Sequence, residues 1–290
     1  MRTDAEMEAL IRGLAEERPE VRAVWLNGSR ANPTAPRDAL QDFDVVFAVT
    51  DTAPMLGDRG WLRRFGEVAV MQEPDASALY PCDSKARDRY AFLIQFADGA
   101  RLDLTLLAPP LWFAVYREDP QTILWLDKDG AFPPLPPPTD RAYWLTPPTA
   151  AQFISCCNEF WWVAPYVGKG LWRGELLYAV DLLNEAVRPM LLRLLGWQAG
   201  YDGGFGRSAG KCCKYLPAML SAEDRAALYR TYPPLEPAAL WAALEAAMDL
   251  FSAAAPRVAA RADLPYDAAE EAGSRAWLRK LRAAAPGGPL

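Results

Sequence analysis

The chain has 290 residues, and its 31 Lys and Arg against 37 Asp and Glu give a formal charge of −6. This length suggests two domains or one large one with a sizeable core, and the acidic balance argues against nucleic acid and favours a cationic small-molecule partner. The absence of histidine excludes Ser-His-Asp catalysis and His-ligated zinc, so acid–base chemistry must come from carboxylates.

Residues 3–18 are predicted to form an amphipathic helix, because apolar side chains recur at helical spacing and Thr3 with Glu6 matches a capping box. The acids in this segment are unlike the apolar core of a signal peptide. No apolar run approaches the roughly 18 residues of a membrane span. We therefore expect a cytoplasmic protein with no membrane segment.

The N-terminal half is predicted to contain a sheet. Apolar and β-branched residues favour strands at 21–27, 42–50, 90–96 and 101–107. Turn-forming residues after position 30 indicate a loop, and the Asp98-Gly99 step marks a hairpin between the last two strands. These strands are expected to be neighbours in one sheet.

A proline-rich stretch at 132–141 marks a change in the pattern. Five of the six positions 133–138 are proline, which can continue neither helix nor strand and is typical of a stiff linker. We predict a domain boundary here, between 1–138 and 139–290. The expected fold class is α+β, with a mixed-sheet α/β domain followed by an all-helical domain.

The C-terminal half is predicted to be helical. Thr149 and Gln152 form a second capping box, which opens a helix to about Tyr166. A longer helical segment follows at 173–197 and is expected to kink or break near Pro189. Further helices are expected at 222–231, 237–255 and 267–284. The glycines at 200–210 indicate a flexible loop, and residues 286–290 are expected to be disordered.

The cysteines are odd in number, include two adjacent pairs and form no C-x-x-C motif: Cys82, Cys156, Cys157, Cys212 and Cys213. This pattern fits neither a disulfide framework nor a zinc site. We predict reduced thiols, with both adjacent pairs serving as packing residues.

The pattern that carries chemistry is Gly28-Ser29, then Asp42 and Asp44, and later Asp103. Residues two apart on a strand share a face, so the first two carboxylates are expected to project together, with Asp103 turned toward the same end of the sheet. Mutual repulsion favours a bound divalent cation, and Mg²⁺ suits carboxylate oxygens. Gly28 allows the backbone to approach a phosphate, to which Ser29 can donate a hydrogen bond.

This pattern resembles the nucleotidyltransferase superfamily related to DNA polymerase β, whose motif is Gly-Ser, a spacer, Asp-x-Asp and a third acid. Longer stretches, among them LNGSRAN, QDFDVVFAVTD, DGARLDLTLL, YVGKGLWRGELLYAVDLLNEAVRP and GKCCKYL, are similar to the aminoglycoside 6-adenylyltransferases, the streptomycin-modifying branch of that superfamily. The resemblance runs from the first helix to about residue 260.

The resemblance implies a catalytic domain at 1–138 and a helical domain at 139–290 that binds substrate and nucleotide. ATP would donate AMP to an aminoglycoside hydroxyl, foremost the 6-hydroxyl of streptomycin, and release pyrophosphate. The antibiotic would thereby be inactivated. Two Mg²⁺ ions would be held by Asp42, Asp44 and Asp103, with Asp103 also the general base.

The triphosphate would be held by five residues: Gly28, Ser29, Arg30, Lys211 and Lys214. For Arg30 the alternative is an ion pair with a loop acid, and for the lysines it is plain solvation.

A cationic acceptor would be recognised by acids and aromatic rings. Glu159 and Trp162 are three apart on one predicted helix, and Asp181 and Glu185 are four apart on the next. Carboxylates pair with guanidinium groups, and tryptophan faces attract cations, although core packing is the alternative for the tryptophan. Glu159 and Asp181 lie in apolar runs and are expected to be partly buried.

Two other functions remain open. In the first, the same chemistry serves another aminoglycoside, a lincosamide, or a protein or tRNA end, of which tRNA is disfavoured by the acidic charge. A catalytically inactive nucleotide-binding module is the other alternative, although all three acids are present. The protein is expected to be a monomer or a weak homodimer.

Overall fold

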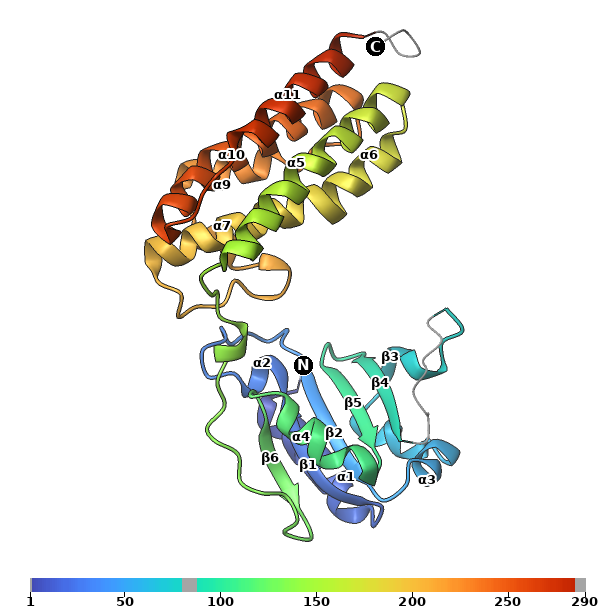
Figure 1. Cartoon of the computed structure of the whole chain (residues 1–290). Coiled ribbons are helices and arrows are strands. Elements are labelled where there is room, and N and C mark those ends of the chain that lie inside the picture. Colours follow the sequence, from blue (N-terminus) through green and yellow to red (C-terminus); the bar gives the residue numbers. More distant parts are fainter. Residues whose placement is uncertain (1, 80–87, 285–290) are drawn as a thin grey trace. The chain divides into compact units, whose positions relative to one another are not determined.

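The computed structural model describes residues 2–79 and 88–284 and divides the chain into two units, Met1–Ala142 and Tyr143–Leu290 (Figure 1). The division lies shortly after the boundary predicted at 138. Cys82 and the C-terminal residues 286–290, both subjects of predictions, lie outside the described residues.

A mixed sheet forms the centre of the first unit. Its described strands follow the order β3-β4-β5-β2-β1-β6, with β2 and β5 parallel and the other neighbours antiparallel. The strands are β1 (Val21–Asn27), β2 (Phe43–Val49), β3 (Val68–Gln72), β4 (Arg89–Phe96), β5 (Arg101–Leu107) and β6 (Ile123–Asp127).

The four predicted strands are all present, and Gly99 makes the expected turn between β4 and β5 with a φ of 92°. The sequence did not predict β3 and β6. Both lie at the edges of the sheet, where few residues are buried, so neither carries the strong apolar signal of a central strand.

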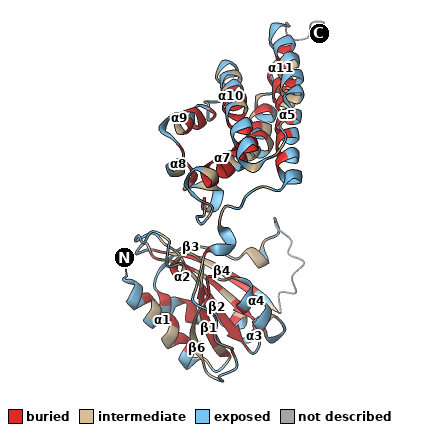
Figure 2. Ribbon diagram, turned by 60° about the vertical axis from the view of Figure 1, so that its left-hand side comes forward, coloured by how far each residue is buried: buried red, intermediate tan, exposed pale blue. Residues whose placement is uncertain are grey.

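Alternate residues along the central strands face two separate layers. On one face α1 (Asp4–Glu17) covers the sheet with Met7, Ile11 and Leu14, and its predicted Thr3/Glu6 capping box is confirmed. On the other face α4 (Trp112–Glu118) places Tyr116 against Trp25. Figure 2 shows the strands as largely buried and the outer sides of the helices as exposed. The short helices of this unit are α2 (Gly28–Ala31) and α3 (Ala53–Gly57).

The proline-rich stretch, predicted to be a stiff linker, packs on the first unit at its start. Phe132 is buried beside Trp25 and Tyr116, and the Tyr116 hydroxyl donates to the Pro133 carbonyl over 3.1 Å. An extended proline segment cannot join the sheet, but the apolar side chain at its start can still fill the second layer.

Among its described residues, the regular structure of the second unit is helical, apart from one isolated bridge between Trp144 and Ser208. Its helices are α5 (Ala150–Arg173), α6 (Leu176–Leu182), α7 (Arg188–Gly203), α8 (Leu216–Met219), α9 (Ala222–Arg230), α10 (Pro237–Ala262) and α11 (Ala268–Ala283). The Thr149/Gln152 capping box that opens α5 is confirmed.

Two helices are longer than predicted, since α5 continues to Arg173 instead of about Tyr166 and α10 to Ala262 instead of about residue 255. The helix α5 passes Pro165 and α10 passes Pro256. In α5 the buried side chains of Val167 and Leu171 lie beyond the proline, and their burial offsets the lost backbone hydrogen bond.

Near Pro189, where a kink or break was predicted, the backbone stays helical and passes through a π-helical turn at Leu183–Val187 that joins α6 to α7. A proline ring clashes with the carbonyl four residues earlier, and the wider turn relieves that clash. The prediction of a flexible loop at 200–210 is wrong for the first residues of that range, because α7 extends to Gly203.

One described helix, α10, is long and apolar enough by composition to cross a membrane, and half of its most apolar window is buried in the unit. Its buried residues, including Leu240, Leu244 and Phe251, form part of the helical core. Core packing therefore accounts for its apolar character, which the sequence reasoning did not notice.

Candidate active site

The predicted acids come together at one end of the central parallel strand pair. In the β2–β5 ladder Asp44 is the direct partner of Asp103, and Asp42 lies one residue before β2 begins. All three side chains are partly exposed. Their approach depends on strands that are far apart in the sequence.

The Gly-Ser turn lies against these acids. Asn27, the last residue of β1, pairs with Asp44, and Gly28 follows directly with a φ of 72°. A β-carbon added to Gly28 would meet Asp44 Oδ2 at well under 3.0 Å. Only glycine combines this backbone conformation with this approach. Gly28 and Ser29 thereby bring backbone and hydroxyl donors next to the carboxylates.

Negative charge is concentrated at Asp44. Its burial, followed by the charges of Asp103 and Asp42, raises the pKa of Asp44 to about 6, although the nearby Arg101 opposes this shift. A carboxylate that is costly to ionise gains most from a bound cation. The site therefore favours a positively charged partner.

Arg101 supplies part of this positive charge. The sequence reasoning did not predict it as a residue of the site. Its Nε and Nη2 each donate to one oxygen of Asp103 at 3.0 Å, and its Nε lies 3.5 Å from Asp42 Oδ2. Hydrogen bonding to Asp103 raises the pKa of Arg101. Because Arg101 is two residues before Asp103 on the same strand, the shared face was a signal that could have identified it.

Within the described residues, no group of three or more His, Cys, Asp or Glu side chains is arranged so that by itself it could hold a metal ion. The donors nevertheless fit Mg²⁺, since carboxylate oxygens are its preferred protein ligands and its remaining positions take water or phosphate oxygens. Burial, and then the charges of Asp103 and Asp42, raise the pKa of Asp44, and a bound cation would offset both effects. Asp42, Asp44 and Asp103 are thus the residues that suit a divalent cation.

Arg30 is buried and points inward, unlike the predicted phosphate contact. Its guanidinium forms an ion pair with Asp4 at 2.6 Å, donates to the carbonyls of Gln41 and Asp42, and lies 3.8 Å from the centroid of the Phe43 ring. The ion-pair alternative therefore describes this residue, with Asp4 of the first helix in place of a loop acid. Arg30 anchors the backbone immediately before β2.

The acceptor residues predicted in the helical unit are all exposed: Glu159, Trp162, Asp181 and Glu185. The expected partial burial of Glu159 and Asp181 is wrong, because the neighbouring apolar residues turn to the core while these acids occupy the outer faces of α5 and α6. Exposure leaves the four side chains accessible to a ligand.

Lys211 and Lys214 flank an unusual turn. Cys212 and Cys213 both have positive φ values, 54° and 58°, a conformation that residues with a β-carbon rarely adopt. Both lysines are exposed, and Cys212 is exposed too, so its predicted packing role is wrong.

The packing role is confirmed for the buried pair Cys156 and Cys157. All four described cysteines are free thiols, as predicted.

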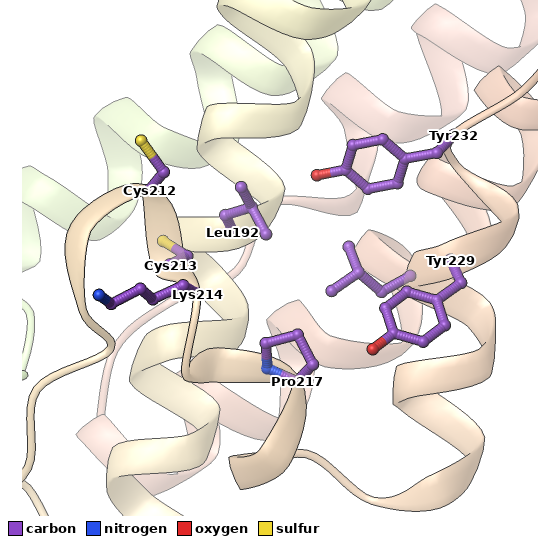
Figure 3. A pocket seen from close by; sticks show the side chains of 8 residues that line it. Leu192, Cys212, Cys213, Lys214, Pro217, Tyr229 and Tyr232 are labelled. Atoms are coloured by element: carbon purple, nitrogen blue, oxygen red, sulfur yellow. The ribbon is translucent and has the colours of Figure 1, made fainter. Parts of the chain in front are cut away.

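A pocket of about 400 Å³ adjoins this turn (Figure 3). Lys214 and Cys213 lie on one side, and Tyr229 and Tyr232 lie opposite. Sequence reasoning missed this pocket, because it depends on α9 packing beside a turn with no regular structure.

A glycine-serine turn beside acids on a mixed sheet is the arrangement expected of a nucleotidyltransferase, and comparison with known proteins shows an enzyme of that class. The family model described as streptomycin adenylyltransferase matches residues 1–281, and the chain belongs to this family of enzymes.

Several relatives are similar over most of their length. An aminoglycoside 6-adenylyltransferase of Campylobacter jejuni is 36% identical over 97% of each chain. Another, of Bacillus subtilis, is 38% identical over 87% of this chain and 88% of its own. A crystal structure of an aminoglycoside 6-adenyltransferase from Bacillus subtilis matches with a TM-score of 0.48 and 31% identity, over 98% of this chain and 100% of that chain.

Proposed function

We propose that the chain transfers AMP from ATP to a hydroxyl of an aminoglycoside, with the 6-hydroxyl of streptomycin as the favoured acceptor, and releases pyrophosphate. The observation that carries this proposal is the pairing of Asp44 with Asp103 beside Gly28. The names of the family and of the relatives support an adenylyl group and an aminoglycoside acceptor. Such a transfer inactivates the antibiotic and makes resistance the proposed role.

Asp42, Asp44 and Asp103 are the residues proposed to hold two Mg²⁺ ions. When bound, the ions stabilise the attacking and leaving oxygens of an in-line displacement and neutralise the triphosphate. The support for this assignment is the pKa of Asp44, which is raised by burial and then by the charges of Asp103 and Asp42.

Asp103 is the proposed general base. As the acceptor oxygen forms its bond to the α-phosphorus and the bond to pyrophosphate breaks, the hydroxyl proton passes to an Asp103 oxygen. Arg101 donates one hydrogen bond to each of these oxygens, and each oxygen keeps a second lone pair that can accept the proton. Arg101 is therefore the proposed counter-ion that holds the Asp103 carboxylate in place.

The triphosphate is proposed to contact the Gly28-Ser29 turn and the exposed Lys211 and Lys214. Gly28 lets the backbone approach phosphate oxygens. The Ser29 hydroxyl can donate a hydrogen bond to them, and the lysines supply positive charge. Arg30 acts indirectly in this proposal, by holding the Asp42 carbonyl in place.

The cationic acceptor is proposed to contact exposed groups of the helical unit, namely Glu159, Trp162, Asp181 and Glu185. Carboxylates pair with guanidinium groups in two-point contacts, and an indole face adds a cation–π contact. Streptomycin carries guanidinium groups that suit these partners.

Pyrophosphate release with Mg²⁺ and ATP tests the proposal. We expect streptomycin to support turnover, with kanamycin and tobramycin slower by at least about tenfold, since they lack guanidinium groups. Equal turnover with all three would remove the streptomycin assignment. No turnover with any aminoglycoside, but turnover with a lincosamide, would move the activity to the other acceptor class.

A further inference from the structure

A second pocket lies wholly within the helical unit, between α5 and α11, and encloses about 490 Å³. None of the acids of the candidate active site lines it. Its walls are unusually aromatic, with Trp161 and Trp162, Tyr166 and Trp277. Trp162 remains 64% exposed although it is one of the largest apolar side chains. An exposed indole at the mouth of a pocket is typical of a ligand-binding surface.

A glycine in the middle of α11 keeps this pocket open. No described atom lies within 4 Å of a β-carbon added to Gly273, so close packing does not require the glycine. Glycine costs about 1 kcal/mol relative to alanine inside a helix. Gly273 therefore lowers the stability of α11 and leaves open space in the pocket wall.

The polar groups gather near the glycine. Glu270 accepts a hydrogen bond of 2.6 Å from the Asn158 amide. One helical turn later Ser274 is only 8% exposed, and its hydroxyl has no hydrogen-bond partner among the described residues. An unsatisfied buried hydroxyl costs about 1–3 kcal/mol. A ligand with an N–H donor between Glu270 and Ser274 satisfies both side chains.

The aromatic wall already holds a positive charge. The Lys169 ammonium lies 4.4 Å from the centroid of the Tyr166 ring. The helices α5 and α11 run parallel, because Asn158 contacts Glu270 and Trp172 contacts Ala284 further along. Lys169 is thus about 16 Å along α5 from Asn158. The Glu270 carboxylate remains available for a second cation.

We propose that this pocket binds a flat organic cation, an amidinium or guanidinium group on an aromatic or ring-shaped body. The charged group pairs with Glu270 and donates to Ser274, and the body lies against Trp162 and Trp277. Aromatic faces and a carboxylate both favour a cation over an isosteric neutral molecule. The pocket shares Trp162 with the proposed acceptor contacts, whereas Glu270, Ser274 and Trp277 belong to the pocket alone, so its test with Glu270→Gln does not depend on the proposed transferase activity.

Calorimetric titration of the full chain with benzamidine and with its neutral isostere benzamide tests the proposal. We expect benzamidine to bind at least about tenfold more tightly. Glu270→Gln keeps an acceptor for Asn158 but removes the charge, so it should weaken benzamidine at least about tenfold and leave benzamide unchanged.

Gly273→Leu fills the pocket and should abolish benzamidine binding while the melting temperature stays equal or rises. The matched control is Gly13→Leu in α1, where an added β-carbon also meets no described atom within 4 Å. The control should bind benzamidine normally. Equal affinity for the two probes, no binding at about 10 mM benzamidine, or unchanged binding by Glu270→Gln would overturn the proposal.

Discussion

Gly28 and Asp44 are in such close contact that the glycine has no room for a β-carbon beside Asp44 Oδ2. The contact joins the turn after β1 to the acid-bearing strand β2. The conformation of the turn and the position of the carboxylate therefore depend on each other.

Gly28→Ala should displace Asp44 and strain the turn. We expect turnover to fall at least about tenfold and the free energy of unfolding to fall by about 1–3 kcal/mol, because a residue with a β-carbon must adopt a positive φ there. Gly130→Ala is the control, since Gly130 has a φ of 62° but no described atom within 4 Å of the added carbon. It should lose some stability and keep its turnover, as measured by urea unfolding and pyrophosphate release.

Asp44→Asn should stabilise the metal-free protein and abolish turnover. The pKa of Asp44 is about 6 in the folded state, and its ordinary value is 3.8. The folded state therefore keeps this proton up to a higher pH than the unfolded state does. The free energy of unfolding therefore falls as the pH rises from about 4 to 6 and stays lower above pH 6.

The asparagine removes this penalty, so we expect a gain of about 1–2 kcal/mol at pH 8 that vanishes near pH 4. A full two-unit shift would correspond to about 3 kcal/mol, and the partial exposure of Asp44 reduces it. Urea unfolding in EDTA measures the gain, with Asp181→Asn as an exposed-acid control. An equal gain at both pH values would contradict the electrostatic explanation.

Asp103→Asn should distinguish the role of general base from the role of metal ligand. If Asp103 accepts the hydroxyl proton, this variant should retain measurable binding of Mg²⁺ and a non-hydrolysable ATP analogue and lose more than about 100-fold in turnover. Asp42→Asn should weaken nucleotide binding and turnover together. Calorimetry and a streptomycin turnover assay test both variants. Near-normal turnover of Asp103→Asn would place the base elsewhere, with Glu159 the next candidate.

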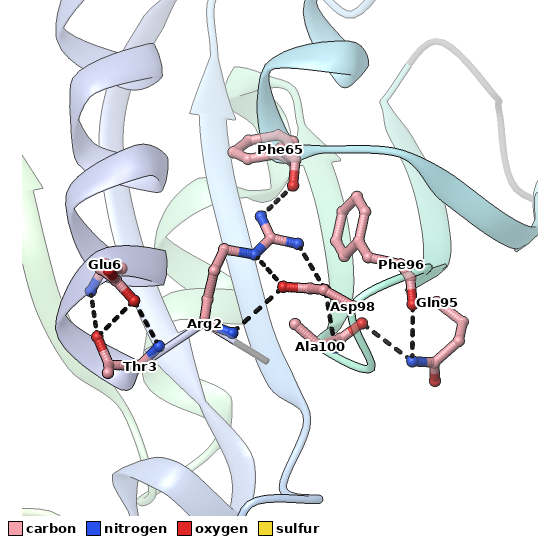
Figure 4. Close-up of polar contacts among 8 residues, drawn as sticks. All are labelled: Arg2, Thr3, Glu6, Phe65, Gln95, Phe96, Asp98 and Ala100. Carbon is pink, nitrogen blue, oxygen red and sulfur yellow. Dashed lines mark hydrogen bonds and ion pairs between the residues drawn. The ribbon is translucent and has the colours of Figure 1, made fainter.

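Arg2 ties the N-terminus to the β4–β5 hairpin (Figure 4). Its Nε lies 2.8 Å from Asp98 Oδ2, its guanidinium also donates to the Phe65 carbonyl, and it lies 4.6 Å from the centroid of the Phe96 ring. Hydrogen bonds from Arg2 hold the pKa of Asp98 below its usual range. The ion pair therefore stabilises the fold above the ordinary pKa of an aspartate, and this stabilisation is lost as the pH falls.

Arg2→Ala should lower the free energy of unfolding by about 1 kcal/mol at pH 7, with the difference shrinking below about pH 4. Arg261→Ala is the control, because its 3.2 Å pair with Asp202 is more exposed, and it should change stability by less than about 0.5 kcal/mol. Thermal unfolding of both variants across this pH range provides the measurement. A larger loss at pH 3 than at pH 7 would argue against the ion pair.

Local signals in the sequence determined much of this fold. The capping boxes at Thr3 and Thr149 depend on residues three positions apart, and the turn at Gly99 depends on one permissive residue, so each is read without tertiary context. The acids Asp42, Asp44 and Asp103 were identified in the same way, from their spacing beside a Gly-Ser step.

Only the tertiary structure decided how these parts meet. The parallel register that sets Asp44 against Asp103 joins β2 and β5, which are neighbours in the sheet but are separated in the chain by β3 and β4, and no local pattern specifies it. The inward turn of Arg30 depends on Asp4, far away in the sequence, and the exposure of Glu159 depends on which face of α5 the other helices cover. Long-range packing selects among conformations that local propensity leaves nearly equal in energy, and this is why the sequence named the acids but not the contacts that position them.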